Sequence, residues 1–381
     1  MIRVVMVTPN FSLVEGGVNG GTQGVSLYLC RALANIQDVD LHVICPLDSN
    51  HTQGFRNIHG LNVHVLGKCI GIPGLFDEFD RMKTISLVNK LSPHVVHFQT
   101  LPSWANKCPI PSVVTIHGIR ELDVLYSNSF AISRIKFLIL SFQESRARKK
   151  VKNVIANSSY VHSFLSRKGT QQVWNIPNPV AEDFFNIQRA PVSGRIFSAS
   201  HMTHIKNVRS LIEAFAVVAN TYPQAELRLA GSHQESFYGH QCRLLVDNLG
   251  LSDRVKFLGL LPVVELKEEL SRAACFALCS YQENAPLSIS EAMAAGVPIV
   301  ASRVGGIPWM LNEGQSGILI NSKNVHDISH GLLVALSNPR NESLGIQAKK
   351  RAEQLFKPDV VANQTLNVYL EIISNAKASI E

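Results

Sequence analysis

The chain has 381 residues, a formal net charge of +7, and 46% hydrophobic against 17% charged residues. This length exceeds one ordinary compact domain, which predicts two, and the apolar content excludes an intrinsically disordered protein. The apolar start of the chain is too short for a signal peptide, and no run approaches the roughly 18 apolar residues of a membrane-spanning helix. We therefore expect a cytoplasmic protein.

The seven cysteines are scattered and odd in number, which indicates buried free thiols in a reducing compartment. Charge is uneven: residues 1–180 hold 18 Lys/Arg and 10 Asp/Glu, whereas residues 181–381 hold 18 and 19. A basic first half suits nucleic acid, an anionic membrane surface or an anionic acceptor. No nucleic-acid-binding motif or aromatic platform accompanies the charge, so we predict no nucleic-acid partner.

Short apolar runs alternate with helical patterns along the first half of the chain. We expect strands at 4–7, 41–45, 63–66, 95–98, 113–117 and 154–157. Apolar positions at helical spacing follow the first of these runs. This alternation predicts a parallel sheet with crossover helices.

The same pattern restarts after two closely spaced prolines, Pro177 and Pro179. A helix is expected over 207–221, and strands at 195–199, 227–230, 255–257, 275–278, 299–301 and 318–320. We predict an α/β protein of two Rossmann-like doubly wound domains that face each other across a cleft. The domains are residues 1–178 and 179–357, and a helix in 358–381 is expected to cross back to the first domain.

The segment from Glu283 to Val300 is the most informative. Pro286 suits the first turn of a helix and Gly296 its end, so we expect a helix over about 285–295. In a doubly wound domain, the N-terminus of such a helix points into the crevice where phosphates bind. Glu283 stands just before this helix and Glu291 lies on it, so each carboxylate can accept hydrogen bonds from hydroxyls beside a bound diphosphate.

Two glutamates eight positions apart, followed by Ala-Met-Ala-Ala-Gly-Val-Pro, resemble the signature of the retaining glycosyltransferases of family 4 (glycosyl transferases group 1), which have the GT-B fold. The resemblance is specific over residues 196–330 and rests on pattern and a few phrases over 1–180. It implies that Glu283 binds hydroxyls of the donor hexose and that Glu291 holds the nucleotide ribose. It also implies a backbone contribution at the sugar and phosphate from Asn284, Ala285, Pro286 and Leu287.

Lys206 matches the family's basic motif, which implies that it neutralises the departing diphosphate. The family usually has Gly-Arg six and five residues before this lysine, where this chain has Ser200 and His201. Two interpretations of His201 stay open: a donor to the phosphate, which would make binding pH-sensitive, or an ordinary loop histidine. Gly305-Gly306 matches a glycine pair near the donor.

In the first half, Gly20-Gly21 falls where the family has a glycine pair, and a glycine-rich loop lets the backbone approach phosphate or sugar. His117, at a strand end, resembles the family histidine that reaches the donor sugar. Domain closure is expected to bring it there. The resemblance therefore implies three catalytic residues, Glu283, His117 and Lys206.

The basic stretch Arg146–Lys152 follows Leu138 and Phe142 at helical spacing. It has two interpretations: a solvated helix face, or a peripheral contact with the inner face of the cytoplasmic membrane. We expect no cofactor and no metal, because the resemblance implies that the helix end and basic side chains take the place of a metal ion. Asp38-Val39-Asp40 precedes a strand, away from the cleft, and is not interpreted as a metal motif.

The sequence thus predicts a retaining glycosyltransferase that moves a hexose-type sugar from a UDP- or GDP-sugar to an acceptor. A lipid-linked or surface-polysaccharide precursor is the acceptor class that members of the family suggest. A GT-B epimerase or phosphorylase is one alternative. A non-catalytic nucleotide-sugar-binding protein is another, since the arginine of the basic motif is absent.

Overall fold

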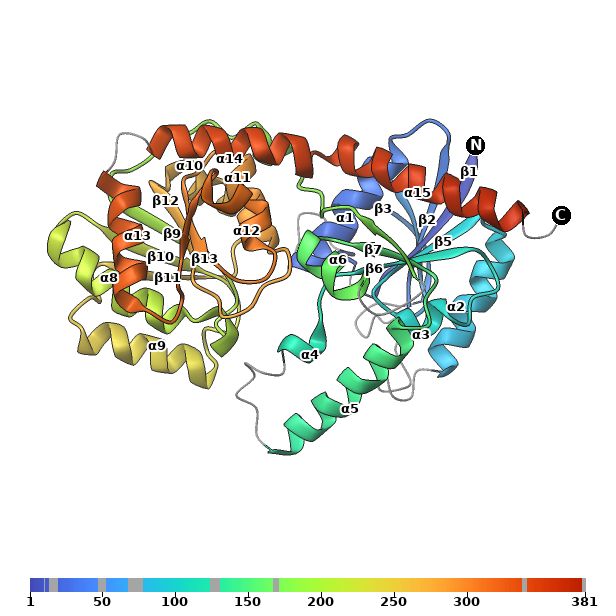
Figure 1. The fold of residues 1–381 in the computed structure, drawn as a ribbon, viewed down its shortest axis with the longest axis horizontal. Helices are drawn as coiled ribbons and strands as arrows, with labels where there is room; N and C mark the ends of the chain where they lie inside the picture. The colour runs from blue at the N-terminus through green and yellow to red at the C-terminus, as the bar shows by residue number, and fades with distance from the viewer. Residues whose placement is uncertain are drawn as a thin grey trace. The chain divides into compact units, whose positions relative to one another are not determined.

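The computed structural model describes residues 1–9, 11–13, 20–46, 53–67, 78–123, 131–166, 171–337 and 341–378. These residues divide into two compact units (Figure 1). The first unit contains the described residues up to Pro179 together with the C-terminal helix from Pro358. The second unit contains the described residues of Val180–Lys357.

The first unit is built on one eight-stranded sheet in the order β3-β4-β2-β1-β5-β6-β7-β8. Among the strands of the described residues, only β3 runs antiparallel to its neighbour, and the strand order reverses direction between β1 and β5. The strands are β1 (Ile2–Val7), β2 (Val39–Cys45), β3 (Gly54–Ile58), β4 (Leu61–Val65), β5 (Val95–Gln99), β6 (Ser112–Ile116), β7 (Asn153–Ala156) and β8 (Gln172–Asn175).

Helices surround this sheet, and the C-terminal helix α15 packs against α1 and beside β5 (Figure 1). Pro358 opens α15, a position where the missing N–H of proline has no consequence. The buried core joins the sheet to the α3 segment through Phe98, Trp104 and Val114. The helices are α1 (Gly21–Ala34), α2 (Glu78–Leu91), α3 (Pro102–Ala105), α4 (Arg120–Asp123), α5 (Ala131–Arg148), α6 (Ser159–Ser166) and α15 (Pro358–Ala378).

The second unit has a six-stranded parallel sheet in the order β11-β10-β9-β12-β13-β14. This is the doubly wound order 3-2-1-4-5-6, which binds ligands at the carboxyl ends of the strands where the order reverses, here between β9 and β12. The strands are β9 (Arg195–Ala199), β10 (Glu226–Ala230), β11 (Val255–Gly259), β12 (Cys275–Leu278), β13 (Ile299–Ser302) and β14 (Ile318–Ile320). The predicted α/β class with two Rossmann-like sheets is confirmed.

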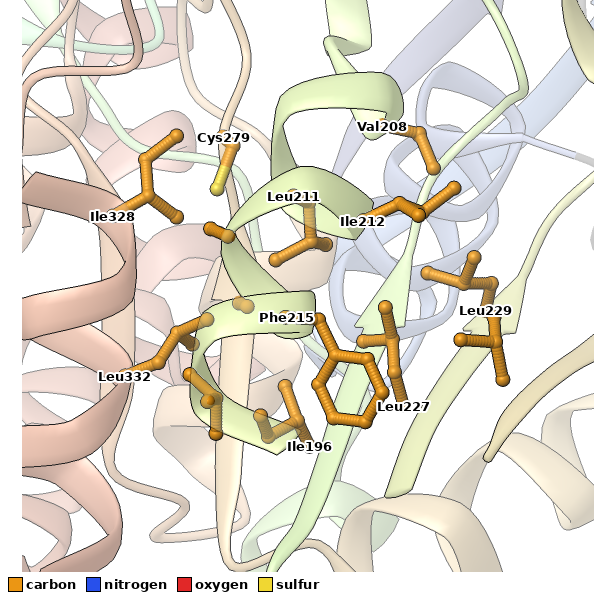
Figure 2. Close-up of a cluster of buried hydrophobic side chains, with 14 of the residues drawn as sticks. Ile196, Val208, Leu211, Ile212, Phe215, Leu227, Leu229, Cys279, Ile328 and Leu332 are labelled. Atoms are coloured by element: carbon orange, nitrogen blue, oxygen red, sulfur yellow. The ribbon is translucent and has the colours of Figure 1, made fainter. Parts of the chain in front are cut away.

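One core of the second unit lies between the sheet and helices α8 and α13 (Figure 2). Phe215 of α8 lies over Leu227 of β10, and Leu332 of α13 belongs to the same cluster. The helices are α7 (Glu182–Phe185), the 3₁₀ turn η2 (His204–Lys206), α8 (Val208–Thr221), α9 (Phe237–Asn248), α10 (Val263–Arg272), α11 (Leu287–Ala294), α12 (Ile307–Met310), the 3₁₀ turn η3 (Asn312–Gly314), α13 (Val325–Ser337) and α14 (Asn341–Phe356).

No helix in the described ranges is both long enough and apolar enough to cross a membrane. Six cysteines in those ranges carry free thiols, and all of them except Cys108 are buried. Cys69 lies outside the described residues.

Candidate functional site

The loops that follow β9 and β12 meet at the point where the strand order of the second unit reverses. Lys206 Nζ donates a hydrogen bond to Glu283 Oε1 over 2.5 Å, and Ser280 Oγ donates to the same oxygen over 2.7 Å. The backbone N–H of Tyr281 donates to the carbonyl of Ile205, which ties the two loops together. The structure therefore brings together the predicted Lys206 and Glu283 as an ion pair.

Glu283 is only 7% exposed, and one of its oxygens stays available. Oε1 accepts both hydrogen bonds, and no group within the described ranges donates a hydrogen bond to Oε2. A carboxylate fixed through one oxygen presents the other in a defined direction, which suits a ligand hydroxyl.

A glycine pair sets the backbone position of Glu283. Gly305 has a φ of +54°, and a Cβ on it would lie 1.6 Å from the carbonyl oxygen of Glu283. Gly306 N–H donates to that same oxygen over 3.3 Å. A side chain at position 305 would therefore displace the segment that carries the glutamate.

Helix α11 begins just beyond Glu283, two residues later than expected. Pro286 is extended, with φ −66° and ψ 120°, because it caps the helix instead of forming its first turn. The first amide to bond to the cap residue is that of Ile289, which donates to the carbonyl of Pro286 over 3.1 Å. The N–H groups of Leu287 and Ser288 precede it and form the positive end of the helix. Gly296, at φ +73°, ends the helix as predicted.

Glu291 lies one turn into α11 and is 6% exposed. Burial raises the pKa of its carboxyl to about 8. Desolvation disfavours the charged form, so the group is mostly protonated at neutral pH. The predicted ribose contact would offset that penalty, because hydroxyl donors stabilise the carboxylate.

His201 belongs to a cluster contributed by two strand ends. It follows β9, whereas Ser232 and His233 follow β10. Ser232 Oγ lies 2.6 Å from His201 Nδ1 and 2.7 Å from His233 Nδ1. Burial lowers the pKa of His201, and the nearby His233 and Lys206 lower it further, whereas Glu283 raises it.

The first unit carries a different polar cluster at the ends of β5 and β6. His117 Nε2 donates to Gln99 Oε1 over 2.6 Å, and Gln99 Nε2 lies 3.2 Å from His97 Nε2. His97 Nδ1 is 2.6 Å from the hydroxyl of Tyr369 on α15, and its Nε2 is 2.7 Å from Thr115 Oγ1. Burial lowers the pKa of His117 to about 4 and that of His97 to about 3. Both rings are therefore neutral at physiological pH.

The predicted glycine pair opens α1 of the first unit. Gly20 caps the helix in an extended conformation and Gly21 is its first residue. The carbonyl of Gly20 accepts from the N–H of Gly24 over 3.1 Å, so the helix starts at the expected glycine pair.

The basic stretch Arg146–Lys152 is less basic at the surface than the sequence indicates. Arg148 is 3% exposed and donates to Glu121, with Glu144 3.8 Å away. Arg148 therefore contributes no surface charge to either interpretation of the stretch. Arg146, Lys149, Lys150 and Lys152 are exposed.

Sequence reasoning missed the partners of the predicted site residues. Ser280 and Ser232 each lie two residues beyond a strand end, a position that could have marked them and the adjacent His233. His97 is a polar residue in the middle of an apolar strand, which also signals a special environment. In the described ranges no group of three or more His, Cys, Asp or Glu side chains has a metal-binding arrangement, and Asp40 is paired with Arg3 over 2.6 Å.

Comparison with known proteins identifies the family. The model of Glycosyl transferases group 1 matches residues 181–351, and that of Glycosyltransferase Family 4 matches residues 19–184. Together the two models span nearly the whole chain. The protein belongs to this family of glycosyltransferases, as the resemblance predicted.

Similar curated proteins include a synthase, a mannosyltransferase and a glycosyltransferase. N-acetyl-alpha-D-glucosaminyl L-malate synthase of Bacillus anthracis is 29% identical over 279 residues, which cover 70% of each chain. MMP alpha-(1->4)-mannosyltransferase of Mycolicibacterium hassiacum is 27% identical, with 71% of this chain and 68% of that protein covered. D-inositol 3-phosphate glycosyltransferase of Corynebacterium aurimucosum is 32% identical over 43% of this chain and 40% of its own length.

Solved structures establish the fold. Sucrose-phosphate synthase of Thermosynechococcus elongatus superimposes with a TM-score of 0.79 at 18% identity, covering 98% of this chain and all of that one. Anabaena HepE in complex with UDP-glucose gives a TM-score of 0.73 at 17% identity, with full coverage of both chains. These likenesses, with the two doubly wound sheets, show the GT-B fold.

Proposed function

We propose that the protein transfers a hexose-type sugar from a nucleotide-diphosphate sugar to an acceptor hydroxyl with retention of anomeric configuration. The observation that carries the proposal is the Glu283–Lys206 pair beside the N-terminus of α11, where the strand order reverses. We propose a UDP- or GDP-sugar as the donor. The structurally similar Anabaena HepE was solved in complex with UDP-glucose, which supports a nucleotide sugar of this kind.

In the proposed reaction, the bond from the anomeric carbon to the leaving phosphate oxygen breaks while the acceptor oxygen bonds to the same face. The acceptor proton passes to the departing phosphate oxygen. Lys206 and the first amides of α11 stabilise the negative charge that develops on the diphosphate. Because these groups supply positive charge at the leaving group, we propose that transfer requires neither a metal nor a cofactor.

The remaining predicted site residues have binding roles in this proposal. Oε2 of Glu283 accepts a donor-sugar hydroxyl, and Glu291 accepts the ribose hydroxyls. The backbone of Asn284–Leu287, with Gly20 and Gly21, approaches the donor closely. We propose that the neutral imidazole of His117 contacts the donor sugar through a hydrogen bond.

The proposal is tested first by donor binding and then by turnover. Thermal-shift measurements against UDP-glucose, GDP-mannose and ADP-glucose select the donor, and transfer is followed with simple glycoside and lipid-linked acceptors. Glu283→Ala is expected to reduce transfer by about a hundredfold or more while the circular dichroism spectrum is unchanged. Glu268→Ala, on an exposed side chain of α10, is the matched control.

Four outcomes would contradict the proposal. Undiminished turnover by Glu283→Ala would remove the assigned role of the pair. Inversion of the anomeric configuration in the product, observed by proton NMR, would overturn retention. Donor binding without transfer to any acceptor would favour a non-catalytic nucleotide-sugar-binding protein, and rearrangement of the donor sugar would favour an epimerase.

Exposed apolar and basic side chains on and just after helix α5 support the proposal that the acceptor is associated with a membrane. Leu138, Ile139 and Phe142 are 52%, 47% and 67% exposed, and exposed cations follow them along the same segment. Apolar and basic side chains together favour contact with an anionic membrane surface. We expect the protein to sediment with phosphatidylglycerol vesicles and not with phosphatidylcholine vesicles.

A charge-reversal variant tests the contact. Lys149→Glu/Lys150→Glu is expected to reduce sedimentation with anionic vesicles severalfold, because two surface cations become anions. Lys90→Glu on α2 is the control. Equal sedimentation of the double variant and the control would contradict the membrane contact.

A further inference from the structure

A single serine hydroxyl joins two histidines beside the proposed diphosphate site. Ser232 Oγ lies 2.6 Å from His201 Nδ1 and 2.7 Å from His233 Nδ1, and the rings are edge to face with centroids 5.3 Å apart. A hydroxyl has one hydrogen, so Ser232 can donate to only one of these nitrogens. The other nitrogen must carry its own hydrogen and donate to Ser232.

Protonation changes what this cluster can offer a ligand. When both imidazoles are charged, both Nδ1 atoms donate to Ser232 Oγ, which has two lone pairs to accept them. The serine hydrogen is then released to point at a ligand. Full protonation thus creates two positive charges and one additional hydrogen-bond donor at the same place.

The surroundings of His201 set the cost of that protonation. Burial, His233 and Lys206 oppose the charged form, and Glu283 favours it. An anionic ligand that contacts the cluster would favour the charged form of His201, because its negative charge attracts Lys206 and the protonated forms of His201 and His233. Binding of an anion and uptake of protons are therefore coupled.

The backbone holds the cluster in this arrangement. His233 has a φ of +65°, a left-handed conformation that is uncommon for a residue with a side chain. Gly231, at φ +140°, brings this loop so close to the β9 loop that a Cβ would lie 1.8 Å from the carbonyl oxygen of Ser200. Both loops start at neighbouring strand ends, so the two histidines converge from different parts of the sequence.

We infer that Ser232 and His233 join His201 in a diphosphate-binding site that takes up protons when the nucleotide sugar binds. The inference rests on the proposed function and adds a set of binding residues and a pH dependence to it. An arginine, which the family usually has at the position of His201, would carry a constant positive charge. In this chain the positive charge at that position would depend on pH.

Isothermal titration calorimetry tests the inference with UDP-glucose, GDP-mannose and ADP-glucose. The diphosphate of a nucleotide sugar is a diester that does not titrate near neutrality, so any pH dependence belongs to the protein. Titrations at about pH 6 and pH 8, in buffers of different ionisation enthalpy, give the affinity and the number of protons exchanged.

Glu291 acts in the opposite direction, because a carboxyl that ionises to bind ribose releases a proton. The test therefore compares the pH dependence of donor affinity in each variant with that of wild type. In His201→Asn and in His233→Asn, we expect the ratio of affinity at pH 6 to affinity at pH 8 to fall about threefold or more, with fewer protons taken up. His240→Asn, an exposed histidine on α9, is the control and is expected to match wild type.

A gain-of-charge variant provides an independent arm. His201→Arg is expected to bind the donor with a lower ratio of affinity at pH 6 to affinity at pH 8 than wild type, because the guanidinium stays charged throughout this range. An unchanged affinity ratio and proton number in both asparagine variants would overturn the inference while leaving the proposed function intact. Failure of all three nucleotide sugars to bind at either pH would overturn both.

Discussion

The two units place polar clusters at equivalent ends of their sheets but bury them differently. In the first unit, His117 connects through Gln99 to the fully buried His97, and burial holds the pKa values of these imidazoles at about 4 and about 3. In the second unit, His201 shares a serine with the exposed His233. Burial fixes the first pair as neutral hydrogen-bonding groups, whereas the second pair is less buried and shares a single serine hydroxyl.

The same contrast extends to stability. The histidines of the first unit resist protonation, so this cluster is less stable in acid. In the second unit, burial holds the pKa of Glu291 on α11 at about 8, so deprotonation is resisted and this buried carboxyl makes the protein less stable in base. The buried histidines of the first unit and Glu291 of the second unit therefore give the protein opposite pH dependences, and each group can be removed separately.

The largest expected effect comes from the backbone of the second-unit site. In Gly305→Ala, the new Cβ would lie 1.6 Å from the carbonyl oxygen of Glu283, at a φ of +54° that disfavours alanine. Displacement of Glu283 by about 1 Å is expected to lower kcat/KM by a hundredfold or more. Steady-state kinetics on the folded protein measures this effect.

Gly54→Ala is the matched control, because a Cβ there meets nothing within 4 Å. It is expected to leave kcat/KM unchanged. Comparable kinetics in the Gly305 variant and this control would show that the glycine does not position Glu283.

The next effect is a gain of stability in Glu291→Gln. Burial raises the pKa of Glu291 from 4.5 to about 8, so the folded protein retains a proton that the unfolded chain releases as the pH rises from 4.5 to 8. Stability is therefore lost over this window, by about 1.4 kcal/mol for each pH unit. The variant lacks this loss and is expected to be a few kcal/mol more stable than wild type near pH 8.

Urea unfolding at several pH values measures the difference, with the exposed Glu342→Gln as control. The same variant is expected to bind the donor about tenfold more weakly, because an amide is a poorer acceptor for the ribose hydroxyls. A variant with the wild-type pH dependence of stability would contradict a protonated Glu291.

His97→Gln tests the opposite pH dependence of the first unit. The folded-state pKa of about 3 lies below the ordinary value of 6.5, so only the unfolded chain gains a proton as the pH falls below 6.5. Wild type is expected to lose about 1.4 kcal/mol per pH unit from this residue alone. The variant should show a shallower loss of stability between pH 6.5 and 4.5, measured by urea unfolding and compared with the exposed His330→Gln.

The sequence predicted those elements and site residues that carry a local signal. Apolar runs marked β9, β12 and β14 to the residue, and the two glutamates marked the α11 site, because these signals are local. Strands β3 and β8 were missed, since they are edge strands with mostly exposed or half-exposed side chains and lack the apolar signal of a buried strand.

The partners of the site residues were beyond local patterns. His233 meets His201 only because β10 lies beside β9, and Gln99 meets His117 only because β5 lies beside β6. The predicted start of α11 was two residues too early, because a proline suits both the first turn of a helix and its N-cap. The ψ of 120° at Pro286 makes this residue the N-cap.

The smallest effect is expected at Gln99, which we interpret as a positioning residue for His117. Its Oε1 accepts from His117 Nε2, and its Nε2 donates to Met6 Sδ over 3.2 Å, so His117 must carry its hydrogen on Nε2 and leave Nδ1 free to accept. In Gln99→Leu that restraint is lost while burial is kept, and we expect kcat to fall about threefold to tenfold with little change in KM.

Gln99→Glu separates this orienting role from a purely structural one. The carboxylate can accept the same hydrogen bond but adds a negative charge, so the pKa of His117 should rise from about 4 toward its ordinary range. NMR titration of the His117 ring measures that rise, and the acid limb of the rate profile should move to higher pH with it. If both Gln99 variants keep the wild-type pH profile, Gln99 only fills space, and burial alone keeps the first-unit histidine neutral.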